Sequence, residues 1–258
     1  MGIGIFYAVV IFLASILGAI VGLGGAVFFR PIFDAVGYHD VQNILFIASS
    51  AILTMAVVST VKKVRDGIDV DIKIALLISL GAVAGGSAGQ FIINYLTDIF
   101  PNDAVQRIQI VVMVVFLCTA LFLASKKNLR YQVKNKILCV LLGIVLGAFS
   151  AFLGIGGGPI NVPVMMILFS QPIKTATTYS IIIIFFSQLS SLVSMGVTIG
   201  FGAFDLRMLL FVVPAAALGG LVGARFSKIF SDTTVKRLFT AAIAVVIIFN
   251  VINGIFVI

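Results

Sequence analysis

Apolar runs of about 20 residues recur along the whole of this 258-residue chain. Each such run is long enough to cross the roughly 30 Å hydrocarbon core of a bilayer as a helix. The composition agrees, because 61% of the residues are hydrophobic and 10% are charged, whereas a soluble domain carries about 25% charged residues. The runs lack the alternating pattern of an outer-membrane barrel. The sequence therefore predicts an all-α, multi-pass protein of the cell (inner or plasma) membrane.

Ten apolar segments can be read along the chain, five in each half. The second segment of each half is short, and at 1.5 Å per residue it reaches only about half to two-thirds of the way across the core. The segments are roughly 4–21, 25–38, 43–61, 72–96, 104–124, 137–153, 158–170, 174–196, 206–226 and 237–257. The pattern predicts about eight full helices and two short ones.

The two halves read as copies of each other. The stretch GLGGAVFFRP at 22–31 returns as GIGGGPINVP at 154–163, with glycines and a final proline in register at an offset of 132. Further pairs follow in the same order, namely Asp71 with Asp205, Lys73 with Arg207, Gly85 with Gly219, Gly86 with Gly220, Gly89 with Gly223, Val105 with Val235 and Arg107 with Arg237. This order predicts an internal repeat. We expect one membrane repeat at 1–125, a basic cytoplasmic linker at 126–136 and a second membrane repeat at 137–258.

Lysine and arginine are spread unevenly over the connections. The connections around 62–73, 126–136 and 225–237 are rich in them, whereas those at 97–107 and 197–207 carry one arginine each. Placing the rich connections and Lys174 in the cytoplasm puts 14 of the 17 basic residues inside, as the positive-inside rule requires. Equivalent connections then fall on opposite sides, which predicts inverted repeats with both termini outside.

The first two segments of each half are expected to form a hairpin whose tip holds the glycines. In lipid, a broken backbone is tolerated only where it is buried in protein or lines a cavity. The helix that begins after each tip has unpaired N–H groups with partial positive charge, which suit an anion. The expected substrate-binding positions at the tips are Gly22, Gly24, Gly25, Gly154, Gly156, Gly157 and Gly158, and the expected helix breaks are Pro31, Pro159 and Pro163.

Small residues can instead serve close helix packing in membranes. We prefer that interpretation for GGSAG at 85–89 and GGLVG at 219–223, and the substrate interpretation for the two tips. A dinucleotide fingerprint does not explain the tips, because Val27 and Pro159 stand where G-x-G-x-x-G needs glycine and no βαβ unit surrounds either copy.

Arg30 carries a charge inside a membrane segment. Such residues are costly in a bilayer, so Arg30 is a candidate functional residue. Its planar guanidinium suits an oxyanion. Two alternatives stay open, since Arg30 can pair with Asp34 one turn later or extend to the membrane surface. Asn161 stands at the place of Phe29 in the other half and offers a neutral donor.

Further polar residues lie deep in the third segment of each half. Ser49 and Gln188 are the candidates for contact with substrate, although hydrogen bonding between helices is the commoner role. Their polar neighbours are Ser50, Thr54, Ser187 and Ser191. Asp34 is the candidate for ion coupling, whereas His39 and Asp40 are expected in an outer loop.

Several function classes are disfavoured. The net charge of +8 follows from the positive-inside rule and does not call for a nucleic-acid partner. A single His39 cannot build a metal site, and Cys118 and Cys139 lie in apolar runs as packing residues. The chain has no Glu and no close Ser/His/Asp set, which argues against a membrane enzyme. We expect no cofactor and no metal; the lipid bilayer and a small anion are the expected partners, and homo-oligomerisation is left open.

With both tips placed, the chain resembles the TauE/SafE family, described as sulfite or organosulfonate exporters. The family pattern is close to G-x-G-G-G-x-x-x-x-P. The second copy matches it fully, with Gly154, Gly156, Gly157, Gly158 and Pro163, whereas the first has Ala26 in place of the third consecutive glycine. The resemblance implies a secondary transporter of sulfite, sulfonates or thiosulfate. The alternatives are an anion channel on the same fold and a transporter of a different small anion.

Overall fold

A computed structural model describes residues 2–125, 131–133 and 135–256. The regular secondary structure of these residues is helical, and they form no strand. The helices are α1 Gly2–Val21, α2 Ala26–Val36, α3 Val41–Arg65, α4 Ile72–Ile99, α5 Asn102–Ser125, α6 Lys136–Leu153, α7 Gly158–Leu168, α8 Ile173–Thr198, α9 Leu209–Ile229 and α10 Asp232–Phe256. Two short 3₁₀ turns, Phe201–Ala203 and Leu206–Met208, precede α9.

The predicted fold class is confirmed. Eight of the described helices are long and apolar enough to cross a membrane, while α2 and α7 have 11 residues each. Each of the ten helices overlaps one of the ten apolar segments expected from the sequence. The part of the predicted linker at 126–130 and 134 lies outside the described residues.

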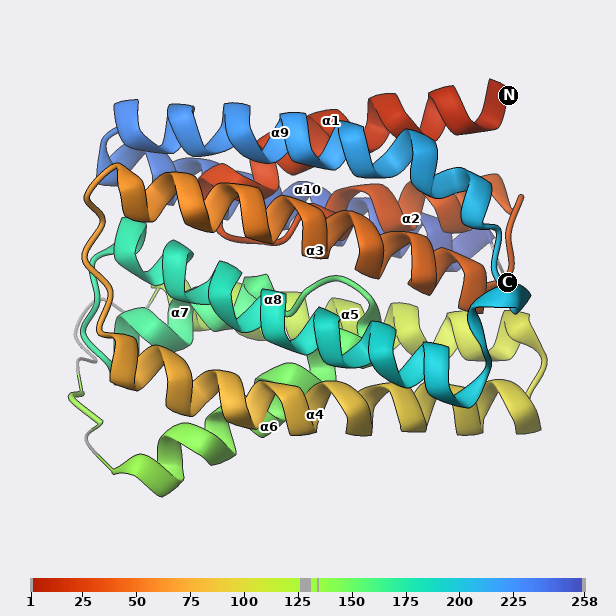
Figure 1. Ribbon diagram of the computed structural model, residues 1–258, viewed down its shortest axis with the longest axis horizontal. Helices are drawn as coiled ribbons and strands as arrows, with labels where there is room; N and C mark the ends of the chain where they lie inside the picture. Colours follow the sequence, from red (N-terminus) through yellow and green to blue (C-terminus); the bar gives the residue numbers. More distant parts are fainter. Residues whose placement is uncertain (1, 126–130, 134, 257–258) are drawn as a thin grey trace.

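The helices run roughly parallel to one axis, so the bundle has two ends (Figure 1). One end, here called the basic end, carries the last turn of α5 and the connections that follow α3, α7 and α9. The other, the terminal end, carries the start of α1 and the connections that follow α2, α4 and α8. The two basic-rich connections that the structure describes in full, after α3 and after α9, therefore share one end, as expected. Which end faces the cytoplasm stays a prediction.

Glycine stripes bring the long helices into close contact. A Cβ atom added to Gly81 of α4 would lie 2.8 Å from Ile144 N of α6, and one added to Gly85 would lie 2.8 Å from Ala148 N. On the other side, a Cβ atom at Gly219 of α9 would lie 2.6 Å from Phe12 O of α1. Only glycine permits backbones to approach this closely. The packing interpretation of the two glycine stretches is confirmed.

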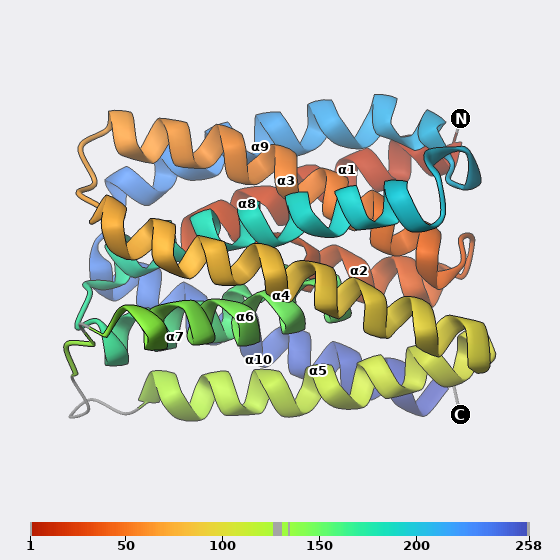
Figure 2. The same cartoon turned by 60° about the horizontal axis from the view of Figure 1, so that its bottom comes forward.

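These contacts interlock the two halves. The long helix of the first hairpin, α1, packs on α9 of the second half, and α6 of the second hairpin packs on α4 of the first half. Helices α3 and α8 lie side by side between these pairs (Figures 1 and 2). In both pairs, the long helix of one half's hairpin packs on the fourth helix of the other half. This arrangement has the symmetry expected of an inverted repeat, although the repeat itself stays an interpretation.

Candidate substrate site at the hairpin tips

Both hairpins turn on glycines with the same backbone geometry. The φ angles are 76°, 86° and 64° at Gly22, Gly24 and Gly25 of tip 1. At the equivalent positions of tip 2, the glycines of residues 154, 156 and 157, they are 59°, 85° and 65°. Residues with a side chain rarely adopt such angles. The matching sequence stretches therefore fold into the same turn twice.

The two hairpins enter from opposite ends of the bundle (Figure 1), and the neighbours of their glycines place the two tips against each other in its interior. A Cβ atom added to Gly158 would lie 2.5 Å from Leu23 Cα, and one added to Gly24 would lie 3.3 Å from Ile155 O. Helix α8 braces tip 1, since the Ser180 hydroxyl donates to Gly22 O at 2.7 Å. The tips and this part of α8 are buried.

Helices α2 and α7 begin at these tips without a side-chain cap. Their N-cap residues are Gly25 and Gly157, and neither makes a capping hydrogen bond. By contrast, α3, α4 and α6 begin near the ends of the bundle and are capped by Asp40, Asp71 and Asn135. The first N–H groups of a helix need partners. Two uncapped helix starts placed together in the interior are an arrangement that suits an anion, and the anion site itself stays a prediction.

The prolines do not break the helices, which corrects one sequence expectation. Pro31 and Pro163 each lie inside an 11-residue helix, and Pro159 occupies the first turn of α7. Proline fits the first turn because the N–H group it lacks has no helical partner there. In the interior it removes one hydrogen bond, which these helices tolerate. The chain breaks at the glycines instead.

Arg30 joins the first hairpin to the second. Its side chain is 1% exposed, which rules out extension to the surface. Nη2 donates to Gln109 Oε1 of α5, and Gln109 Nε2 in turn donates to Phe152 O near the end of α6 at 2.7 Å. Nη1 has no hydrogen-bond partner, and a Cβ atom added to Gly154 would lie 2.7 Å from it. One guanidinium nitrogen therefore faces tip 2 with its donors free.

The Asp34 pairing left open by the sequence is present. Arg30 Nε lies 3.6 Å from Asp34 Oδ2, and both side chains are at least nine-tenths buried. The pair does not exclude a second role for Arg30, because Nε and Nη1 have no hydrogen-bond partner.

A polar cluster surrounds the start of α7. Asn161 is fully buried, and neither its Nδ2 nor its Oδ1 has a hydrogen-bond partner. Its Oδ1 would lie 3.4 Å from a Cβ atom at Gly157. Ser150 Cβ would lie 3.1 Å from the same added atom, and Ser150 Oγ accepts from Gln188 Nε2 at 2.9 Å and lies 2.8 Å from Ser187 Oγ. The structure thus brings Asn161 and Gln188 to the same tip.

Two residues of this site were not predicted from the sequence. Gln109 gave a weak signal, because it lies near the start of its apolar segment, two residues after Arg107. Ser150 gave none, since a serine in a helix can bond to a carbonyl of its own helix. Only the packing of α6 against α8 makes it a partner of Gln188.

The remaining candidates lie elsewhere. Ser49 is buried in α3, and none of the contacts described above joins it to the tips. Asp40 caps α3 at the terminal end. His39 lies in the same connection but is half-buried, with Nδ1 3.1 Å from the Tyr7 hydroxyl and Nε2 3.7 Å from Asp205 Oδ2. That contact fastens the connection after α2 to the connection after α8.

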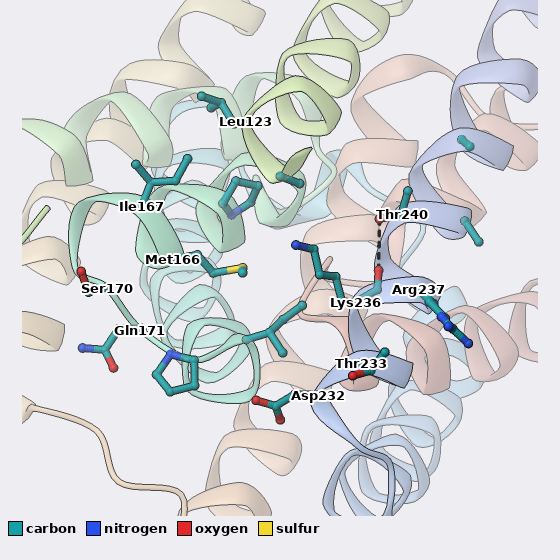
Figure 3. A pocket seen from close by; sticks show the side chains of 16 residues that line it. Leu123, Met166, Ile167, Ser170, Gln171, Asp232, Thr233, Lys236, Arg237 and Thr240 are labelled. Carbon is teal, nitrogen blue, oxygen red and sulfur yellow. Dashed lines mark hydrogen bonds between the residues drawn. The ribbon is translucent and has the colours of Figure 1, made fainter. Parts of the chain in front are cut away.

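A cavity of about 990 Å³ lies beside the second hairpin rather than at the tips. Figure 3 shows it between α7, with Met166 and Ile167, and α10, with Lys236. The Lys236 side chain points into it, whereas Arg237 points away. Its wall includes Pro163, so it reaches the middle of α7 and stops short of the tip.

The chain is similar to known membrane proteins. The family model described as "Sulfite exporter TauE/SafE" matches residues 7–250. A probable membrane transporter protein, YunE of Bacillus subtilis (strain 168), is 23% identical over 269 residues, which cover 95% of this chain and 96% of YunE. The probable membrane transporter protein MamO of Magnetospirillum gryphiswaldense is 29% identical over 112 residues, which cover 42% of this chain and 18% of MamO. No solved structure matches the chain.

Proposed function

The chain belongs to the TauE/SafE family of membrane transporters, and we propose that it is a secondary transporter of a small sulfur-containing anion, of the sulfite, sulfonate or thiosulfate class. The proposal rests chiefly on one observation: two uncapped helix starts, one from each hairpin, meet inside an apolar bundle. The family description supports the sulfur chemistry. The geometry supports a small anion.

Two free donors fit an oxyanion. Arg30 Nη1 comes from the first hairpin and Asn161 Nδ2 from the second, and both are buried without a hydrogen-bond partner. Leaving a buried donor unpaired costs about 1–3 kcal/mol. An anion with three or more oxygens would accept from both side chains, so binding would remove that cost. The backbone of the helix starts adds fewer donors, because Ala26, Phe28, Ile160 and Asn161 already donate to tip carbonyls and Pro159 has no N–H group.

Alternating access follows from the way the hairpins enter. Each tip is reached from a different end of the bundle, so parting one hairpin from α8 would open the site to one solution only. Under this proposal, the basic end faces the cytoplasm and the termini lie outside, as the positive-inside rule predicts.

Asp34 is the proposed coupling residue. Its carboxylate lies 3.6 Å from Arg30 Nε and competes with an anion for the guanidinium. Protonation of Asp34 would release Arg30 for the substrate, so that a proton and an anion would move together. An Asp34→Asn variant should keep anion binding and lose the response of transport to a pH gradient.

The direct test is counterflow in proteoliposomes. Vesicles loaded with unlabelled thiosulfate or sulfite and diluted into labelled anion should accumulate label transiently above its outside concentration. A channel of the same fold cannot do this and would only equilibrate the label. No uptake of any sulfur anion would refute the substrate class.

Two variants locate the site. Arg30→Ala should reduce transport about 10-fold or more, because a hydrogen bond to a charged group is worth about 1.5–3 kcal/mol. Arg30→Lys keeps the charge without the planar fork and should retain part of the activity. Gly157→Leu should block binding, because its φ of 65° and the nearby Ser150 Cβ at 3.1 Å leave no place for a side chain. Wild-type transport by Arg30→Ala would remove Arg30 from the site.

A further inference from the structure

A second buried cation lies on the basic-end side of tip 1. Lys63, in the last turn of α3, was expected in a cytoplasmic connection, but its side chain is 1% exposed. Its neighbour Lys62 behaves as expected, since it is 29% exposed and pairs with Asp66 at 2.8 Å. Two adjacent lysines at the same helix end therefore have opposite environments.

Within the described residues, Lys63 has no carboxylate within ion-pair distance. Its Nζ donates to Thr177 Oγ1 at 3.2 Å, which leaves the other ammonium hydrogens without a charged acceptor. Asp66, the acidic residue three positions along, is taken by Lys62 and by Lys228 Nζ at 3.2 Å. The charged group that acts electrostatically on Lys63 is another cation, Lys174. A buried charge without a counter-charge is strongly unfavourable.

Thr177 connects Lys63 to the first tip. Its Cα would lie 2.7 Å from a Cβ atom at Gly22, and its hydroxyl donates to Lys174 O at 2.8 Å, which leaves its oxygen to accept from Lys63. One turn of α8 further on, Ser180 donates to Gly22 O. Lys63 thus stands next to tip 1 toward the basic end, while Arg30 stands beside tip 2.

We propose that Lys63, together with Thr177 and Lys174, forms a second anion-binding site between tip 1 and the basic end. This inference rests on the proposed function and extends it. The transported oxyanion occupies this site as it passes between the tips and the basic-end solution, and it supplies the negative charge that Lys63 lacks. The ligand class is a small oxyanion that can accept two or more hydrogen bonds, such as thiosulfate or sulfite.

A purely structural role for Lys63 predicts a different outcome. If the hydrogen bond to Thr177 mainly held α3 against α8, Lys63→Met would lower thermal stability. If Lys63 instead serves to bind an anion, Lys63→Met removes a buried charge that has no counter-charge in the anion-free protein, so thermal stability should rise while transport falls. Stability and transport therefore move in opposite directions only under the proposal.

The test uses the full chain in proteoliposomes and in detergent, with thiosulfate as the probe. Lys63→Met should raise the thiosulfate concentration for half-maximal uptake about 10-fold or more and should reduce the thermal stabilisation of the protein by thiosulfate relative to sodium chloride of equal ionic strength. Lys63→Arg should retain most of the uptake. The matched control is Lys62→Met, which removes the same charge one residue away and should transport like the wild type.

The outcomes separate the two proposals. If the wild-type protein neither transports nor is stabilised by thiosulfate, sulfite or a sulfonate, the proposed function and the second site both fall. If the wild type transports and Lys63→Met matches Lys62→Met, the second site alone is wrong. Should Lys63→Met not fold, its buried lysine is structural and the proposal is overturned. Thr177→Val, which removes the acceptor at nearly constant volume, should weaken uptake in the same direction.

Discussion

Gly158→Ala tests the contact between the hairpin tips. Gly158 is the first residue of α7, and an added Cβ atom would lie 2.5 Å from Leu23 Cα and 2.6 Å from Leu23 C. Carbon atoms pack favourably at about 3.5–4.0 Å, so the tips would have to part by about 1 Å. Over-packing of this kind costs about 1–3 kcal/mol.

Helix propensity alone predicts the opposite sign. Alanine is favoured over glycine in a helix by up to about 1 kcal/mol, so a Gly158 that faced open space would gain stability on substitution. Gly2 provides the matched control, because it is also the first residue of a helix and an added Cβ atom there meets nothing within 4 Å. We expect Gly158→Ala to lower stability and Gly2→Ala to leave it unchanged or raise it.

The assay compares apparent melting temperatures in one detergent at one scan rate, together with initial rates of thiosulfate uptake. A cost of about 1–3 kcal/mol disfavours the conformation with touching tips by about 5- to 150-fold relative to one with parted tips. Uptake should therefore fall in Gly158→Ala while the Gly2→Ala protein transports normally. If the two variants melt and transport alike, the tips do not touch and the proposed site loses its basis.

Three further predictions concern packing, positioning and pH. Gly85→Ala should lower the melting temperature despite better helix propensity, because its Cβ atom would lie 2.8 Å from Ala148 N of α6; an unchanged melting temperature would contradict the close α4–α6 contact. Gln109→Leu should destabilise the protein by about 1–3 kcal/mol, since it leaves both Arg30 Nη2 and Phe152 O without their partner. Gln109→Glu keeps an acceptor for Arg30 but loses the donor to Phe152 O, so it should recover only part of the stability, and it should not recover transport, because its carboxylate competes with the anion for Arg30. Lys62 and Lys228 lower the pKa of Asp66, so their contribution to stability is complete above the unfolded-state pKa of about 3.9 and is lost as the pH falls through the lower folded-state value; melting curves of Asp66→Asn should lose part of this acid sensitivity, and identical pH profiles would refute the assignment.

The sequence predicted the helices and the hairpins because both depend on local patterns. Span lengths follow from hydropathy, and a cluster of glycines can turn the chain wherever it occurs. The constant offset between the two glycine stretches already relates tip 1 to tip 2, residue by residue. The packing role of the glycines at 85–89 and 219–223 also followed from their spacing, although their partner helices did not.

The prolines show where local rules were insufficient. Pro31 and Pro163 were expected to break helices, yet α2 and α7 continue through them. A single lost hydrogen bond is tolerated when the flanking turns are held by packing on every side. The position of the break was decided by the glycines, whose positive φ angles no other residue adopts readily.

The sequence by itself determined a multi-pass helical protein with two glycine-tipped hairpins and an arginine inside a membrane segment, whose burial the structure then showed. The tertiary structure alone decided which groups meet: Arg30 with Gln109, Asn161 with the Ser150–Gln188 cluster, and Lys63 with Thr177. These partners are separated by many residues along the chain, so no local pattern encodes their contact. The tertiary structure also decided which charged side chains are buried. Lys62 and Lys63 are neighbours in α3, yet only Lys63 lies on the side of the helix that faces the protein interior.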